Sequence, residues 1–189
     1  MSTIKFDINV IREKLLNTNI KLPIYWNIMK SVHNTNVSTD TRFQHDYKSF
    51  YGMHRYTDAT FCKAYFEYLE ENKNNKSLSF ENVITHLYHC TDTVQPSFSS
   101  KLLHTINQDM PILDSRIIYH LKLKTLPYYF PKVLYYYNDL CNLLTEYLKT
   151  ENASQVITVF DDIFGETGLS DMKKIDNAIW VLGAKPKRK

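Results

Sequence analysis

Two residues of the chain, Lys101 and Asp114, have types and a spacing that suit chemistry on a glycosidic bond. Lys101 is expected near the start of a short helix, and Asp114 is expected to open the next one. A helix N-terminus disfavours a cation, and partial burial lowers the pKa of a lysine, so we expect Lys101 to supply a neutral, nucleophilic amine. The same position keeps the Asp114 carboxylate ionised.

This pair suits the release of a base from a flipped nucleotide. An ionised carboxylate stabilises an oxocarbenium-like sugar, and an amine can attack its anomeric carbon, which leads to an imine intermediate and strand cleavage. The alternative is that Asp114 only caps a helix and Lys101 is only a surface residue. The spacing by itself leaves both interpretations open.

The segments around the pair, SFSSKLL (97–103) and PILDSRI (111–117), resemble the motif of bacterial proteins related to the 8-oxoguanine branch of the helix-hairpin-helix DNA glycosylases. In that superfamily a lysine follows the hairpin, and an aspartate in a Pro-Val-Asp-like segment opens a later helix. Lys101 and Asp114 match these two positions. Residues 47–51 with Arg55, and residues 174–183, resemble flanking segments of the same group.

The resemblance implies an all-α fold and a DNA glycosylase that needs no cofactor and binds double-stranded DNA with a flipped modified base. Asp114 would stabilise the sugar cation, and Lys101 would act as nucleophile or positioning group. A role in anti-phage defence, against modified bases of phage DNA, fits such a protein. The alternative is a catalytically inactive helical module that binds DNA or another protein.

The superfamily hairpin uses glycine amides to hold a DNA phosphate, whereas residues 93–100 contain no glycine, so the hairpin is degenerate. Serine hydroxyls and helix amides at Ser97, Ser99 and Ser100 are the substitutes we expect. The other expected substrate-binding residues are Tyr51 and Arg55 in the flanking segment, His104 on the Lys101 helix, and Arg116 after Asp114.

The net charge of the chain limits how it can bind DNA. The net charge is only +3, so phosphate contacts must be clustered, and residues 184–189 form one short basic tail. Three widely spaced cysteines and the lack of a long apolar stretch predict a cytoplasmic protein with reduced thiols and no membrane partner. We expect a monomer.

Apolar periodicity and helix caps predict one all-α domain of eight or nine helices, with two lobes around a cleft as one option. The β-branched run at 156–160 is assigned to a helix despite its strand propensity. The predicted helices cover residues 7–16, 23–33, 59–72, 97–106, 114–121, 132–149, 153–164 and 170–182, with one more beginning at residue 79.

One further group of residues has types that bind metal ions. His86 and His89 lie three residues apart, next to Cys90, on a predicted helix. That spacing binds a metal only where other ligands converge, and none is evident in the sequence. No metal site is therefore predicted.

Overall fold

The computed structural model describes residues 4–53, 58–127 and 129–183. Within these ranges all the regular secondary structure is helical, and the chain divides into two compact units. One unit comprises residues 21–107, and the other comprises residues 4–20 and 108–183. Among the described residues, no helix combines the length and the apolarity that crossing a bilayer requires.

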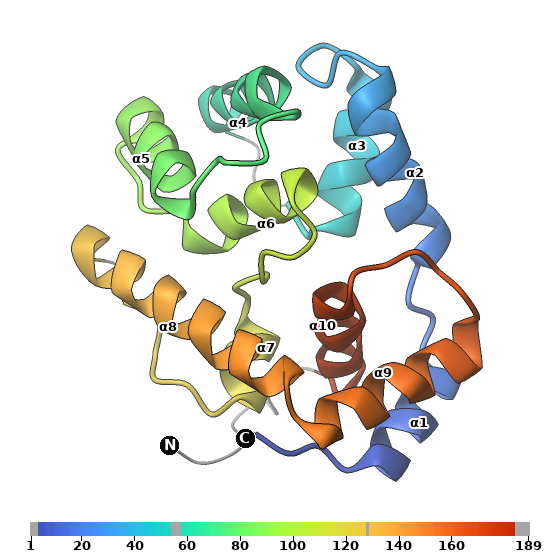
Figure 1. Cartoon of the computed structure of the whole chain (residues 1–189). Coiled ribbons are helices and arrows are strands. Elements are labelled where there is room, and N and C mark those ends of the chain that lie inside the picture. The colour runs from blue at the N-terminus through green and yellow to red at the C-terminus, as the bar shows by residue number, and fades with distance from the viewer. Residues whose placement is uncertain (1–3, 54–57, 128, 184–189) are drawn as a thin grey trace, which may run out of the picture. The chain divides into compact units, whose positions relative to one another are not determined.

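The 21–107 unit contains five helices among its described residues. Helix α6 packs against α4 and α5, and α2 packs against α3 (Figure 1). Nine of the eleven α6 residues are buried, so α6 forms the centre of this unit. The five helices are α2 (Leu22–Asn34), α3 (Thr41–Phe50), α4 (Ala59–Asn72), α5 (Phe80–Thr91) and α6 (Pro96–Ile106).

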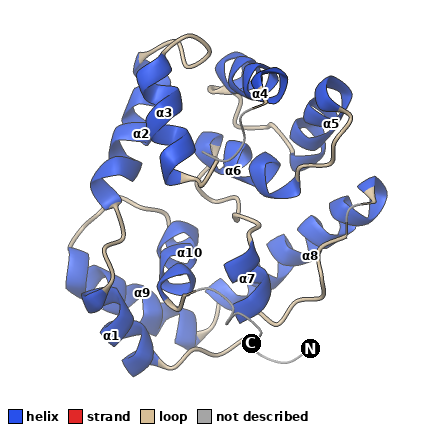
Figure 2. Cartoon of the chain, turned by 180° about the vertical axis from the view of Figure 1, so that it is seen from behind, coloured by secondary structure: helices blue, strands red, loops and turns tan. Residues whose placement is uncertain are grey.

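The other unit is organised around its last helix, α10, which contacts α1, α7, α8 and α9 (Figure 2). Seven residues of α10 are buried, including the polar Lys173 and Asn177. The five helices described here are α1 (Ile8–Asn17), α7 (Ser115–His120), α8 (Phe130–Leu148), α9 (Glu151–Phe164) and α10 (Asp171–Val181).

Local capping explains where most of these helices begin. Ser79 and Asn82 exchange hydrogen bonds in a capping box that starts α5, and Ser170 caps α10 by accepting from the Lys173 amide. Gly183, which has a φ of +93°, follows the end of α10 as predicted. The 156–160 run lies inside α9, so its helical assignment is confirmed.

Helix α3 was not predicted, and it accounts for the tenth helix in the described part of the chain. It is short and buries only Phe43 and Tyr47, which are four residues apart, so it carries a weak apolar stripe. Its one clear sequence signal is Asp40, whose carboxylate accepts the Phe43 amide as N-cap.

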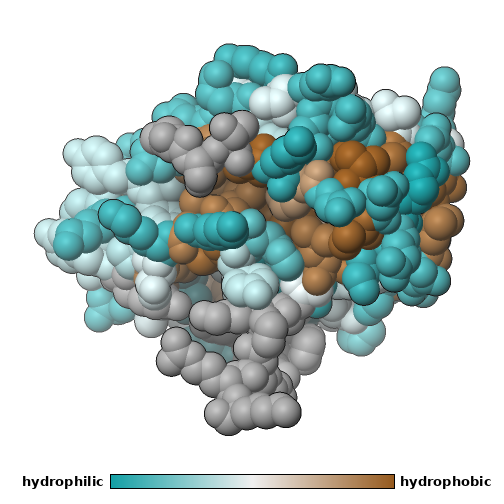
Figure 3. Space-filling model, turned by 90° about the horizontal axis from the view of Figure 1, so that it is seen from below, coloured by the Kyte–Doolittle hydropathy of each residue, from teal (hydrophilic) through white to brown (hydrophobic). Residues whose placement is uncertain are grey.

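The face in Figure 3 carries patches of apolar side chains among hydrophilic ones. On α1, Val10 is 40% exposed and Leu16 is 65% exposed. Single exposed apolar residues are usual on folded proteins, so they do not by themselves mark a binding surface.

Candidate functional site

Lys101 lies on α6 and is half-buried. Its Nζ donates a hydrogen bond to the backbone carbonyl of Tyr51, the residue that ends α3, at 3.0 Å. The same nitrogen lies 5.0 Å from the centre of the Phe98 ring. A carbonyl oxygen and the face of an aromatic ring are both favourable partners for a cationic side chain, so these contacts hold the Lys101 side chain in place.

The expected position of Lys101 at a helix start is wrong. Helix α6 begins at Pro96, so Lys101 is the sixth residue and lies in the second turn. The effect of the macrodipole falls off within the first turn. The dipole therefore does not favour a neutral amine at Lys101.

A buried polar network fixes α6 against its neighbours, and sequence analysis missed it. The hydroxyl of Tyr47 lies 2.9 Å from that of Tyr65 and 3.0 Å from that of Thr105, and Tyr65 donates to the carbonyl of Phe98 at 3.0 Å. Burial raises the pKa of both tyrosines, so both rings stay neutral. The network holds the helix on which Lys101 lies.

Three other expected substrate-binding residues on α6 are fully buried: Ser99, Ser100 and His104. Ser99 donates to the carbonyl of Gln95, and Ser100 donates to that of Ser97, at 2.8 and 2.9 Å. Both hydroxyls thus bond to the preceding turn of their own helix. Their contacts with DNA phosphate stay a prediction.

The imidazole of His104 points into the core of the 21–107 unit. Its Nε2 lies 3.2 Å from the hydroxyl of Tyr25 on α2, and both side chains are fully buried. This contact joins α6 to α2. A role for His104 in substrate binding stays a prediction.

Asp114 is the N-cap of α7. One carboxylate oxygen accepts the amides of Arg116 and Ile117 at 2.9 and 3.0 Å. These two bonds fix the side chain at the helix start. The predicted cap is therefore confirmed, whereas its catalytic role stays a prediction.

Arg116 packs on the last helix of its unit rather than extending into solvent. Its guanidinium lies 4.1 Å from the centre of the Trp180 ring and donates to the Trp180 carbonyl at 2.7 Å. The ring and the carbonyl together hold the cation beside α10. Binding of phosphate by Arg116 stays a prediction.

The expected site residues are divided between the two units. Tyr51, Ser99, Ser100, Lys101 and His104 belong to the 21–107 unit, in which Lys101 contacts Tyr51 directly. Asp114 and Arg116 belong to the other unit. That Lys101 and Asp114 face one another across a cleft stays a prediction.

Two further predicted features, the substrate-binding residue Arg55 and the basic tail of residues 184–189, lie outside the described residues.

The 21–107 unit also contains a polar groove that no sequence pattern indicated. It measures about 280 Å³ and lies between α2 and α3, over Ile28 and Phe43. None of the expected site residues lines it. The polar side chains along its walls are Asn27, Ser31, Asp40, Arg42 and Asp46.

Comparisons with known proteins find no relative of the chain: no protein-family model matches it, and neither a curated protein nor a solved structure matches it significantly.

Proposed function

We propose that the chain is a DNA glycosylase that flips a modified base out of double-stranded DNA and releases it. Asp114 stabilises the sugar cation, and Lys101 acts as nucleophile or positioning group. The proposal rests on the SFSSKLL and PILDSRI segments and on the local geometry of the two residues. The modified bases of phage DNA are the proposed targets, and the proposed setting is a cytoplasmic monomer in anti-phage defence.

The observation that carries the proposal is the placement of the Asp114 carboxylate. Two backbone amides hold it at the start of α7. A fixed carboxylate anion is the group that stabilises positive charge on a sugar whose base is departing. No metal or organic group is needed for this step.

The contacts of Lys101 support one of its two expected roles over the other. The Tyr51 carbonyl and the Phe98 ring hold the Lys101 side chain, and its ammonium can position a phosphate or a leaving base by charge. Attack on the sugar requires the neutral amine, so lyase chemistry needs a proton acceptor in the DNA complex. Base release without strand cleavage is therefore the expected activity.

A second candidate is an inactive helical module that binds DNA or another protein. The observation that favours it is that Asp114, Arg116, Ser99 and Ser100 all make contacts that stabilise helices or their packing. Such contacts explain these residue types without any chemistry.

Base release from a panel of duplexes separates the two candidates. The panel contains oxidised, alkylated, deaminated and glucosylated hydroxymethylated bases. Asp114→Asn is the informative variant, because asparagine also caps helices and so removes the charge while preserving α7. We expect release by the wild type and a loss of at least about 100-fold in Asp114→Asn, in line with the loss of one charge-stabilising group.

Borohydride trapping tests the amine in the same reactions. Lys101→Arg keeps the charge and can still donate to the Tyr51 carbonyl, but it cannot form an imine. Lys63→Arg is the matched control, because the Lys63 side chain is 75% exposed on α4. Release retained in Lys101→Arg supports the electrostatic role, whereas a trapped adduct lost only in that variant supports the nucleophile. No release from any duplex by the wild type supports the inactive module.

A further inference from the structure

The segment that runs from α7 into α8 carries positive charge without any acidic residue. No aspartate or glutamate lies between Asp114 and Asp139, although the whole chain contains 20 acidic residues against 23 basic ones. The basic residues of this stretch are Arg116, Lys122, Lys124 and Lys132. The segment is therefore a local concentration of positive charge in a chain of low net charge.

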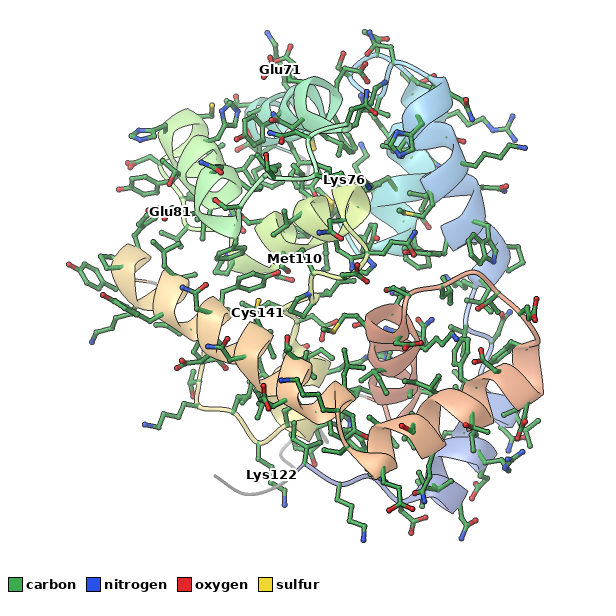
Figure 4. The ribbon with its side chains drawn as sticks, viewed as in Figure 1. Glu71, Lys76, Glu81, Met110, Lys122 and Cys141 are labelled. Atoms are coloured by element: carbon green, nitrogen blue, oxygen red, sulfur yellow. The ribbon has the colours of Figure 1, made fainter. Side chains whose placement is uncertain are left out.

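The three lysines of this segment are exposed. Within the described parts of the chain, none of their ammonium groups forms a hydrogen bond or an ion pair. Figure 4 shows Lys122 extending away from the ribbon just beyond α7. Arg116 differs from them, because its guanidinium packs on Trp180. The lysines, rather than the arginine, are thus available to an anionic ligand.

Two exposed tyrosine rings lie beside these lysines. Tyr129, the N-cap of α8, is 65% exposed, and Tyr135 is 74% exposed. Lys132 is three residues after the first and three residues before the second. Residues three apart are neighbours on a helix surface, so the Lys132 side chain lies between the two rings.

A hydrogen bond brings the loop after α7 to the same place. The hydroxyl of Tyr136 donates to the backbone carbonyl of Lys124 at 2.6 Å. The loop therefore runs back beside α8 (Figure 1), next to the turn that carries Lys132 and Tyr135. We call this part of the molecule the α7–α8 surface. It consists of Lys122, Lys124, Tyr129, Lys132 and Tyr135.

The chemistry of the α7–α8 surface matches a single strand of nucleic acid. Lysine ammonium groups bind phosphates, and exposed aromatic rings stack on unpaired bases. In a duplex the bases are already stacked inside the double helix, so the two rings would gain no base contact. The lack of acidic residues in the segment also removes a source of repulsion toward phosphates.

We propose that the α7–α8 surface binds single-stranded DNA, with its three lysines on phosphates and its two tyrosine rings on bases. The choice of DNA rests on the proposed function, in which a base is flipped out of a duplex. Asp114 begins α7 and the surface follows the end of that helix, so both belong to one unit. The surface holds a strand that is opened near the flipped base.

Fluorescence anisotropy of the full-length chain with an unmodified, labelled oligothymidylate tests this proposal. A length of about 12 nucleotides lies within the site sizes usual for single strands. We expect saturable binding that weakens as salt is added. The plot of log K against log salt concentration should have a slope of about −2, because each of three phosphate contacts contributes about −0.7.

Variants of the surface decide whether these residues make the contacts. Tyr135→Ala should weaken binding by about tenfold, in line with the loss of one stacked base, whereas Tyr135→Phe keeps the ring and should bind like the wild type. Lys132→Gln should make the salt slope less steep by about 0.7. The matched controls on the other unit are Tyr88→Ala and Lys63→Gln, which change an exposed ring and an exposed charge and should have no effect.

Three results would overturn the proposal. They are no binding of the oligothymidylate at low salt, equal binding by the wild type, Tyr135→Ala and Lys132→Gln, and tighter binding of an oligouridylate of the same length. Anionic vesicles that bind through the same residues, with no binding of the oligonucleotide, would assign the surface to lipid instead. The base-release assay keeps this test separate from the proposed function. Single-strand binding with the expected variant pattern, but without base release, contradicts the glycosylase and supports the surface.

Discussion

The Nζ of Lys101 donates to the backbone carbonyl of Tyr51 at 3.0 Å, across fifty positions of the chain. This bond joins the centre of α6 to the end of α3. It makes Lys101 a structural residue of the 21–107 unit, whatever its part in chemistry. Lys101 variants therefore need a stability measurement beside any activity assay.

We expect Lys101→Met to lower the free energy of unfolding by about 1–2 kcal/mol, because it removes a charged donor and a cation–π contact. Lys101→Arg should lose less, since it keeps the charge. Urea denaturation measures both variants, with Lys63→Met as the exposed control. A loss no larger in Lys101→Met than in that control would show that the Tyr51 contact adds nothing to stability.

Replacement of Asp114 separates capping from charge. Asp114→Ala removes the acceptor of two amides, so the free energy of unfolding should fall by about 1 kcal/mol. Asp114→Asn should change it by only a few tenths, because asparagine caps helices equally well. Thermal and urea unfolding of both variants give this comparison. Equal losses in the two would mean that the charge, and not the cap, stabilises α7.

Removal of the Tyr65 hydroxyl tests the buried network. Tyr65→Phe deletes the donor to the Phe98 carbonyl and the partner of Tyr47, so the expected loss is about 1–3 kcal/mol. Tyr135→Phe is the matched control, because Tyr135 is 74% exposed, and it should leave the free energy of unfolding unchanged. If urea denaturation gives similar free energies of unfolding for the two variants, the network does not stabilise the fold.

The same tyrosines predict an alkaline limit to stability. Burial raises the pKa of Tyr47 and Tyr65 above the ordinary value of 10.0, so the folded chain keeps these protons after the unfolded chain has released them. Their contribution is complete below that value and is lost as the pH rises through the folded pKa. As the pH rises above 10.0, the free energy of unfolding should fall more steeply for the wild type than for Tyr65→Phe. Parallel curves would exclude Tyr65 as a source of the decline.

A buried ion pair on α10 gives a sharper stability test. The Lys173 ammonium lies 2.6 Å from the Asp176 carboxylate, and these side chains are only 4% and 12% exposed. Lys173→Met leaves a buried carboxylate without its cation and should cost about 3–5 kcal/mol. The double variant Lys173→Met with Asp176→Leu should recover much of that loss. A double variant less stable than Lys173→Met would show that Asp176 has other stabilising contacts.

The helical class and most helix starts were predictable because their determinants are local. Asp114 and Ser170 stand directly before their helices, and their side chains accept amides two or three residues ahead. The stripe of apolar residues on α8 likewise lies within a single helix. Helix α3 was missed because two aromatic residues give too weak a stripe, and the buried partners that stabilise it, such as Tyr65, are distant in sequence.

The sequence by itself determined the helical content, the caps and the candidate pair Lys101 and Asp114. Only the tertiary structure decided that the Lys101 amine meets the Tyr51 carbonyl and that Ser99 and His104 are buried. The physical reason is that caps and periodicity depend on neighbours within about one helical turn, whereas burial and charge stabilisation depend on side chains from other helices.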